Sequence, residues 1–390
     1  MYRILVCPNA FKGSLTAPEA AEAVRAGIER AAERLAVEGA PFRDEIAVDL
    51  LPLADGGDGT LQTLVAATGG TTVPCRVTGP LGESVDAAWG RLGGAESGTA
   101  VIEMALASGL ALLRPEQYDP RRATTRGTGE LMRAAMDAGC RKIIVGIGGS
   151  ATNDGGAGMA SALGARFLDV NGQELEPGGA ALAKLASVDL TGMRLPQDVS
   201  VVVACDVDNP LYGPEGASAV YGPQKGATPE IVRELDLALE HYAGIVEQTT
   251  GKSVAEAPGS GAAGGLGAGL LAFCSAEMRS GLDLAMELTG FDARLKASNL
   301  AITGEGRLDS QTVRGKVVAG VVRRARQARV PVVALAGSLE EGAEAALISL
   351  GLSAACSIVD RPMTVEQAMA DAYTLLSDAA ERVVRVLAIQ

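Results

Sequence analysis

The chain has 390 residues, a formal net charge of −13 and 47% hydrophobic residues, but only 3% aromatic residues. This length predicts more than one domain, and the apolar fraction is large enough for a substantial buried core. The negative charge argues against nucleic acid or an anionic membrane surface as a partner. If the ligand is itself an anion, a few local cations must attract it.

The six cysteines form no CxxC pair and mostly lie in or beside apolar runs, which is typical of buried, reduced thiols. No apolar stretch approaches the ~18 residues of a membrane span, and the short apolar run at residues 4–8 leads directly into a polar loop, so we expect no signal peptide. We therefore expect a cytoplasmic protein. His241 is the only histidine and lies in a predicted helix, which argues against a Ser-His-Asp triad or a His-rich metal site.

Short β-branched runs alternate with helical patterns at both ends of the chain. Residues 2–8 and 45–53 predict strands, each followed by a glycine-containing loop and a helix, and Thr16 with Glu19 forms a capping box before the first helix. Residues 299–303 and 330–337 begin two further strand–loop–helix units, and residues 354–360 predict a last strand before a final long helix. Such alternation predicts parallel βαβ units, whose ligand-binding loops share the edge at the carboxyl ends of the strands.

The middle of the chain has a different pattern. Further strands and helices follow from residue 73, and the step from Val170 to Gln173 predicts a tight hairpin turn. We therefore predict an α/β protein with a discontinuous Rossmann- or flavodoxin-like domain (1–72 and 289–390). A second, mixed α/β domain (73–288) would be inserted into it, with the active site in the cleft between the two.

Phosphoryl transfer needs cations and backbone N–H groups around phosphate oxygens, carboxylates for magnesium, and a group that orients the attacking hydroxyl. Lys12 precedes Gly13 at the entry to a predicted helix, where anions bind well. Asp55 and Asp58 lie among glycines in ADGGDGT, and two carboxylates suit magnesium. Either segment is equally compatible with an ordinary loop or turn.

The segment 146–159, GIGGSATNDGGAGM, follows a predicted strand and contains Ser150, Asn153 and Asp154. It also matches the dinucleotide fingerprint, with Asp169 downstream, so a nicotinamide-dependent hydroxy-acid dehydrogenase is an alternative. The hairpin signal directly after Asp169 weakens that alternative, because a Rossmann strand should continue into a loop and a helix.

Three more segments carry polar groups in glycine-rich loops. Residues 205–228 predict a shaped pocket, and residues 303–316 form the densest cluster of charge after a buried strand. Residues 257–270 fit a phosphate-binding nest and a close helix-packing surface equally well. The polar residues of the first two segments are Asp206, Asp208, Asn209, Gln224, Lys225, Glu305, Arg307, Asp309, Gln311 and Lys316.

These segments, in this order, resemble the bacterial glycerate kinase family over essentially the whole chain. The motifs that carry the resemblance are FKGSLTA, ADGGDGT, VTGPLGE, TTRGTGEL, GIGGSATNDGGAGM, ACDVDNPL, GPQKGAT, PGSGAAGGLGAG and TGEGRLDSQT. The chain departs from the family at Asn9, where an acid is common, and at Asp58, where glutamate is common.

The resemblance implies phosphorylation of D-glycerate by ATP with Mg2+, at the 2-hydroxyl and giving 2-phospho-D-glycerate and ADP; a glycerate 3-kinase is the alternative regiochemistry. It implies D-glycerate as the partner molecule and leaves monomer and homodimer both open. We assign the catalytic roles to Lys12, Asp206, Glu305 and Asp309, of which Asp206, Glu305 and Asp309 are also the candidate metal ligands. The expected substrate- and ATP-binding residues are Ser14, Asp55, Asp58, Arg126, Ser150, Asn153, Asp154, Asn209, Gln224, Lys225, Arg307 and Lys316.

Overall fold

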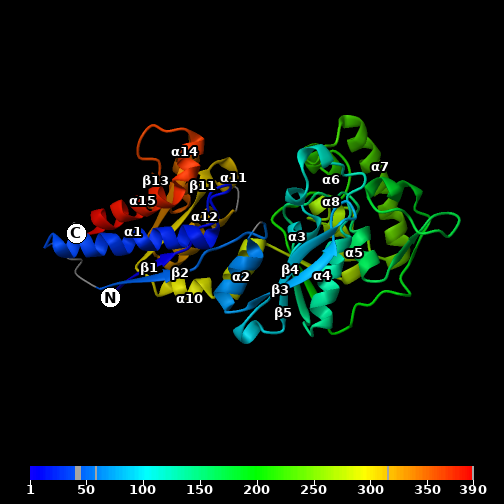
Figure 1. The fold of residues 1–390 in the computed structure, drawn as a ribbon, viewed down its shortest axis with the longest axis horizontal. Coiled ribbons are helices and arrows are strands. Elements are labelled where there is room, and N and C mark those ends of the chain that lie inside the picture. The colour runs from blue at the N-terminus through cyan, green and yellow to red at the C-terminus, as the bar shows by residue number, and fades with distance from the viewer. Residues whose placement is uncertain (40–44, 58, 314–315, 389–390) are drawn as a thin grey trace. The chain divides into compact units, whose positions relative to one another are not determined.

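The computed structural model describes residues 1–39, 45–57, 59–313 and 316–388. Contacts within the chain divide it into two compact units. Unit 1 combines Met1–Asp55 with Leu282–Gln390, and unit 2 is Gly56–Gly281. Each unit has its own main sheet, and Figure 1 shows the strands and helices of both units.

Unit 1 contains a five-stranded parallel sheet in the order β13-β12-β11-β1-β2. Its strands are β1 (Tyr2–Val6), β2 (Ile46–Leu50), β11 (Leu300–Leu308), β12 (Val332–Leu339) and β13 (Ala354–Ser357). Numbered by their succession within the unit, these strands have the 2-1-3-4-5 order of flavodoxin-like folds. The predicted α/β class and the alternation of strands and helices are therefore confirmed.

Helices lie on both faces of this sheet. They are α1 (Ala17–Val37), α9 (Gly281–Leu288), α10 (Phe291–Lys296), α11 (Ser310–Val313), α12 (Val317–Ala328), α13 (Ala343–Leu350), α14 (Val365–Ala370) and α15 (Ala372–Leu387). The capping box predicted at Thr16 and Glu19 is present at the start of α1. Alternate strand residues such as Ile4, Ile302 and Leu335 pack in the core beneath α1 and α15.

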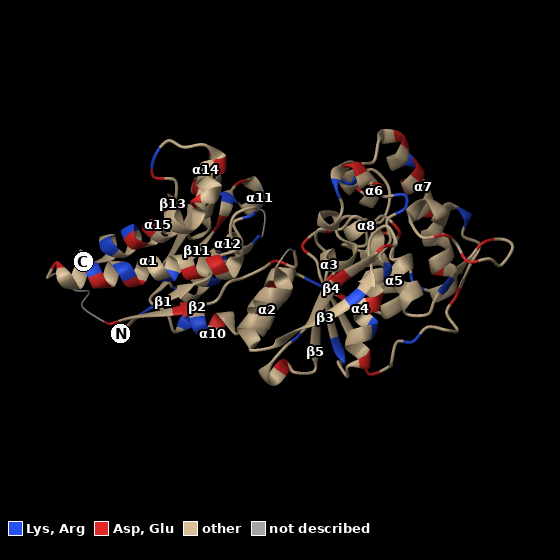
Figure 2. Cartoon of the chain, viewed as in Figure 1, with Lys and Arg blue, Asp and Glu red and all other residues tan. Residues whose placement is uncertain are grey.

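Helices α1 and α15 run side by side (Figure 1) and carry alternating acidic and basic residues (Figure 2). Arg30 donates from Nε to Glu381 Oε2 at 2.5 Å, and Arg34 donates from Nη1 to Glu381 Oε1 at 2.7 Å. Glu381 is nearly buried, with 7% of its surface exposed. Burial acts to raise the pKa of this carboxyl, but the two arginines outweigh it and lower the pKa, so the ion pair joins the two ends of the chain in its charged form.

Unit 2 contains a six-stranded mixed sheet in the order β10-β9-β6-β5-β4-β3. Neighbours from β10 to β5 are parallel, and β5, β4 and β3 are antiparallel. The strands are β3 (Thr71–Thr78), β4 (Ser84–Arg91), β5 (Thr99–Glu103), β6 (Lys142–Gly146), β9 (Ser200–Ala204) and β10 (Glu277–Arg279). The helices are α2 (Thr60–Thr68), α3 (Ala105–Ser108), α4 (Arg126–Asp137), α5 (Ala157–Ala162), α6 (Ala217–Tyr221), α7 (Pro229–Thr250) and α8 (Ala262–Cys274).

The hairpin predicted after Asp169 joins β7 (Arg166–Leu168) to the segment at Glu174, and β7 also pairs with β8 (Ser187–Asp189). Gly172 has φ +73°, and Asp169 Oδ1 accepts from the N–H groups of Asn171 and Gln173 at 2.8 and 2.9 Å. The Asp169 carboxylate therefore stabilises its own turn, which removes the ribose-binding role that the dehydrogenase alternative required of it.

Helix α2 and the residues up to 72 pack with unit 2, whereas the sequence pattern assigned them to the terminal domain. Helix α2 contacts β3, β4 and β5, and a side chain at Gly90 of β4 would collide with Val65 of α2. Only Met1–Asp55 therefore joins the C-terminal segment, and the chain leaves unit 1 directly after Asp55.

The small-residue segment 257–270 leads into α8 and forms its first turns, and residues 259–270 are buried. Ala263, Gly264 and Gly265 have φ values of +54°, +69° and +88°. A Cβ on Gly264 would lie 1.9 Å from the carbonyl oxygen of Thr152, and one on Gly267 would lie 2.2 Å from that of Gly259. This geometry is that of close backbone packing, which was one of the two alternatives for the segment.

Candidate active site

A pocket of about 420 Å³ lies in unit 1 at the carboxyl ends of β1, β11, β12 and β13. Its walls come from the loop 9–14 after β1, from residues 305–309 at the end of β11, and from the segment 358–372. In a sheet of this strand order the chain winds in opposite directions from β1 and β11, and ligands bind in the crevice between these two strands. The pocket therefore lies where the fold itself favours a ligand, and its size is in the ordinary range of about 300–1,000 Å³ for ligand sites.

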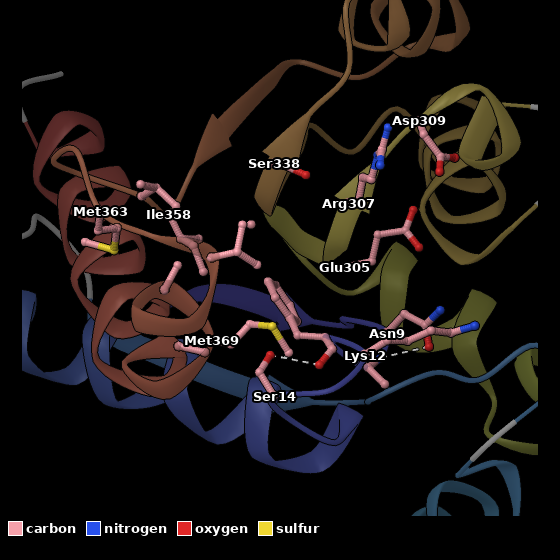
Figure 3. Close-up of a pocket in the computed structure, with 18 of the residues that line it drawn as sticks. Asn9, Lys12, Ser14, Glu305, Arg307, Asp309, Ser338, Ile358, Met363 and Met369 are labelled. Carbon is pink, nitrogen blue, oxygen red and sulfur yellow. Dashed lines mark hydrogen bonds between the residues drawn. The ribbon is translucent and has the colours of Figure 1, made fainter. Parts of the chain in front are cut away.

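One end of this pocket is strongly charged. Lys12, Asp55, Glu305, Asp309 and Lys316 all line it, and Figure 3 shows Glu305, Asp309, Lys12 and Asn9 gathered on the same side. These residues come from four separate stretches of the chain, which the parallel topology brings to one edge of the sheet. Together with Ser14 and Arg307, seven of the residues predicted from the sequence thus line a single pocket.

Glu305 is the most buried carboxylate of the group, with 7% of its surface exposed. Its Oε1 accepts a hydrogen bond from the Thr312 hydroxyl at 2.6 Å. Burial raises the pKa of Glu305, and the charges of Asp309 and Asp55 add to the rise, whereas the Thr312 hydrogen bond and the charge of Lys316 oppose it. Extra positive charge in the pocket would therefore stabilise the ionised form of Glu305.

Three other predicted residues at this pocket have different surroundings. Asp309 is half-buried, and its Oδ1 accepts from the Thr312 N–H at 3.0 Å at the start of α11. Arg307 lines the pocket but is exposed, and its Nη2 donates to Glu340 Oε2 at 2.9 Å. The Ser14 hydroxyl donates to the Phe11 carbonyl at 2.9 Å within the loop (Figure 3).

The floor of the pocket is bare backbone. Gly306 of β11 and Gly337 of β12 both line it and lie on adjacent parallel strands. A Cβ on Gly337 would lie 2.6 Å from the Gly306 carbonyl oxygen, and one on Gly306 would lie 3.4 Å from the main-chain nitrogen of Lys12. Glycine at these positions therefore lets the two strands and the loop after β1 pack closely, and Gly306 and Gly337 line the pocket with main-chain atoms only.

The opposite end of the pocket is apolar and was not predicted from the sequence. Ile358, Met363, Val365 and Met369 line it, and they come from the loop after β13 and from the short helix α14. The sequence signal is weak, since it consists of two large apolar residues four positions apart on a helix of only six residues.

In unit 2, Lys225 is buried with 1% of its surface exposed. Its Nζ donates to the Ser150 hydroxyl at 2.8 Å and to the Thr152 carbonyl at 2.7 Å. Burial lowers the pKa of Lys225 to about 7, against the opposing charge of Asp154. Two residues predicted for binding, Ser150 and Lys225, are thus in direct contact.

Asp154 and Asn153 are held by the fold of unit 2. Asp154 accepts hydrogen bonds from the main-chain N–H groups of Thr125, Gly156 and Gly158, at 2.8–3.2 Å, and from the Thr125 hydroxyl at 3.0 Å. Asn153 is completely buried, and its Nδ2 donates to the Ser218 hydroxyl at 2.9 Å. The contacts of Asp154 join the starts of α4 and α5, which is a structural role.

The remaining predicted residues of unit 2 have separate sets of contacts. Asn209 Oδ1 accepts from the Tyr221 hydroxyl at 2.6 Å, and the exposed Asp206 accepts at Oδ1 from the Gly281 N–H at 3.1 Å. Arg126 is exposed and pairs with Glu130 at 3.2 Å, and Gln224 is exposed on its loop. Asp58 lies outside the described residues.

The chain matches the model of the glycerate kinase family over residues 4–388. A glycerate kinase from Halalkalibacterium halodurans is 48% identical over 385 residues, which cover 98% of this chain and 97% of the relative. A glycerate 2-kinase from Escherichia coli is 43% identical over 389 residues, which cover 99% and 98%. A solved structure from Salmonella typhimurium, provisionally named glycerate kinase 2, is 44% identical, covers 99% of this chain and 98% of its own, and has a TM-score of 0.85.

The family match and these relatives make the chain an enzyme of the phosphotransferase class. It belongs to the glycerate kinase family. Across the described residues, no helix is long and apolar enough to cross a membrane.

Proposed function

We propose that the enzyme transfers the γ-phosphoryl group of ATP to the 2-hydroxyl of D-glycerate, giving 2-phospho-D-glycerate and ADP. The observation that carries this proposal is the unit 1 pocket, in which lysines and carboxylates share one end at the β1/β11 crevice. Phosphoryl transfer needs those groups in one place. The choice of the 2-hydroxyl is supported by the name of the Escherichia coli relative, a glycerate 2-kinase.

In this proposal Lys12 and Lys316 offset the negative charge of the nucleotide phosphates, and the bare backbone at Gly306 and Gly337 lets those phosphates approach. Lys12 is exposed in the loop after β1, and Lys316 stands at the N-cap of α12, so both are accessible to an anion. Ser150 and Lys225 are the candidates in unit 2 for contact with the small acid.

Magnesium fits the carboxylates of the pocket. No group of three histidine, cysteine, aspartate or glutamate side chains within the described ranges is arranged to hold a metal ion by itself. Magnesium in phosphoryl transfer is usually bound by one or two carboxylates together with substrate phosphates, and Glu305 and Asp309 are the two that we assign. When bound there, magnesium would neutralise phosphate charge. The positive charge would also keep Glu305 ionised despite its burial.

A cytoplasmic location is part of the proposal, since ATP and a reducing environment are both available there. All six cysteines are free, three of them buried, and none is in a disulfide, as expected for that compartment.

The test is ³¹P NMR of a reaction containing the enzyme, ATP, magnesium and D-glycerate. A phosphate on the secondary 2-oxygen couples to one neighbouring proton and gives a doublet, whereas a phosphate on the 3-oxygen couples to two and gives a triplet. We expect ADP and the doublet product, with L-glycerate as the stereochemical control. A triplet would establish the 3-kinase alternative, and no consumption of ATP with D-glycerate would contradict the proposal altogether.

A further inference from the structure

The unit 1 pocket has two chemically different ends, and the proposed phosphoryl transfer uses only one of them. Figure 3 shows Met363, Ile358 and Met369 on one side, and Glu305 and Asp309 on the other. D-glycerate is a three-carbon acid with no apolar face, so neither its size nor its chemistry accounts for the apolar end. The phosphates of a nucleotide do not account for it either.

The apolar end is open, and two of its side chains are exposed. Val365 is 70% exposed and Met369 is 39% exposed, although both are large and hydrophobic. They lie four residues apart on α14 and therefore on the same side of that helix. Ile358, by contrast, is 2% exposed and forms the back of the same wall. Exposed apolar side chains that line a pocket indicate a ligand with an apolar surface.

The two ends belong to one continuous space. Met369 reaches the loop that carries Lys12, because a Cβ on Gly13 would lie 2.7 Å from the Met369 methyl group. Between the ends, the paired glycines Gly306 and Gly337 leave a flat stretch of backbone without side chains. A ligand that occupies the whole pocket therefore needs a flat apolar part at one end and a polyanionic part at the other.

We propose that the end of the pocket lined by Ile358, Met363, Val365 and Met369 is the subsite for the nucleobase of the phosphoryl donor. The phosphates extend from it over Gly306 and Gly337 to Lys12 and Lys316. A purine supplies the flat apolar face, and the thioethers of Met363 and Met369 are suited to contact with an aromatic ring. This inference rests on the proposed function, in that it takes the donor to be a nucleoside triphosphate.

The experiment compares Val365→Gln and Met369→Gln with wild-type enzyme. Each substitution replaces an exposed apolar side chain by a neutral polar one, so the fold and the charge of the pocket are retained. Val386→Gln is the matched control, because Val386 lies on α15, is 65% exposed and does not line the pocket. Two ligands are titrated by calorimetry in the presence of magnesium: ADP, which occupies both ends, and inorganic triphosphate, which has no base.

We expect the pocket variants to bind ADP about tenfold more weakly, because each loses apolar contact with the base. The Kd for triphosphate and the KM for D-glycerate should stay at the wild-type values, and Val386→Gln should be unchanged throughout. The base subsite is refuted if the pocket variants bind ADP as tightly as wild type, or if they lose triphosphate affinity to the same degree.

A photolabelling experiment gives a second readout that does not depend on these variants. 8-Azido-ADP carries its reactive group on the base, and we expect the label in the peptide that spans residues 358–372. A label confined to unit 2 would overturn the assignment. Failure of wild-type enzyme to phosphorylate D-glycerate with ATP would contradict the proposed function instead, so the two failures are distinguishable.

Discussion

The buried lysine of unit 2 gives a quantitative prediction about stability and pH. Burial lowers the pKa of Lys225 from 10.5 to about 7 in the folded protein, whereas the unfolded chain keeps the ordinary value. Between these two values the unfolded state binds more protons than the folded state. The free energy of unfolding therefore rises as pH increases through this window, and this contribution is lost as pH falls to about 7.

The magnitude follows from the proton balance. Each pH unit well inside the window adds up to ~1.4 kcal/mol, and integration from about pH 7 to about pH 8.5 gives roughly 1–2 kcal/mol from Lys225. The upper pH is chosen because burial raises the pKa values of Cys7 and Cys274 to about 12, so these thiols act in the opposite direction once unfolded thiols ionise near pH 9.

The perturbation is Lys225→Met, which keeps the length of the side chain and removes the titrating group. Urea unfolding of the substrate-free enzyme is followed by the fluorescence of Trp89, the only tryptophan, which is 2% exposed in unit 2 and so reports on the unit that holds Lys225. We expect wild type to gain roughly 1–2 kcal/mol between the two pH values relative to the variant. Identical pH dependence in both proteins would refute the reasoning, since Lys225 would then be fully charged in the folded state.

Three further predictions concern unit 1 and the core. Glu305→Gln should lower kcat on the order of a hundredfold and raise the magnesium concentration needed for half-maximal rate, whereas Glu29→Gln, at an exposed acid on α1 that does not line the pocket, should change neither. Equal behaviour in magnesium titrations would contradict the role of Glu305. Gly264→Ala should lower the free energy of urea unfolding by more than about 3 kcal/mol, because the new methyl group meets the Thr152 carbonyl. The control Gly213→Ala, also at positive φ but with nothing within 4 Å, should lower it by only about 1–2 kcal/mol. Similar losses in the two variants would show that the close approach at Gly264 is unimportant. Glu381→Gln should remove roughly 1–3 kcal/mol at neutral pH. Since the folded-state pKa of Glu381 is lowered, that contribution is present above about pH 4.5 and disappears as pH falls, so the variant and wild type should converge in acid unfolding curves; a difference that persists in acid would count against the ion pair.

The local parts of the fold could be predicted from the sequence because they depend on residues close together in the chain. The capping box at Thr16 and the hairpin after Asp169 each involve groups within four residues, and both are present. The strand–helix alternation could be predicted for the same reason. The packing of α2 could not, because it depends on partners such as Gly90 that a local pattern does not identify.

The same distinction between local and distant partners holds for the candidate site. Lys12, Asp55, Asp309 and Lys316 follow strands, and Glu305 lies near the carboxyl end of β11. The rule for parallel sheets was therefore enough to expect them near one another. The partners that determine what a polar group can do are distant in sequence and became visible only in the structure.

Asp154 and the apolar wall illustrate what could not be foreseen. Asp154 stands in a glycine-rich loop, and its carboxylate accepts hydrogen bonds from the N–H and O–H groups of Thr125, 29 residues earlier, which the sequence did not indicate. Val365 and Met369 resemble ordinary helix residues in the sequence, and only their place at the pocket gives them a candidate function.

In the proposed complex the nucleotide binds in the unit 1 pocket, with its base at the apolar end and its phosphates at the charged end. A crystal structure of the enzyme with ADP, magnesium and D-glycerate tests it most directly. We predict density for the base against Ile358, Met363 and Met369, and for the β-phosphate beside Lys12. ADP bound in unit 2, or in unit 1 with its base toward Glu305, would contradict this mode of binding.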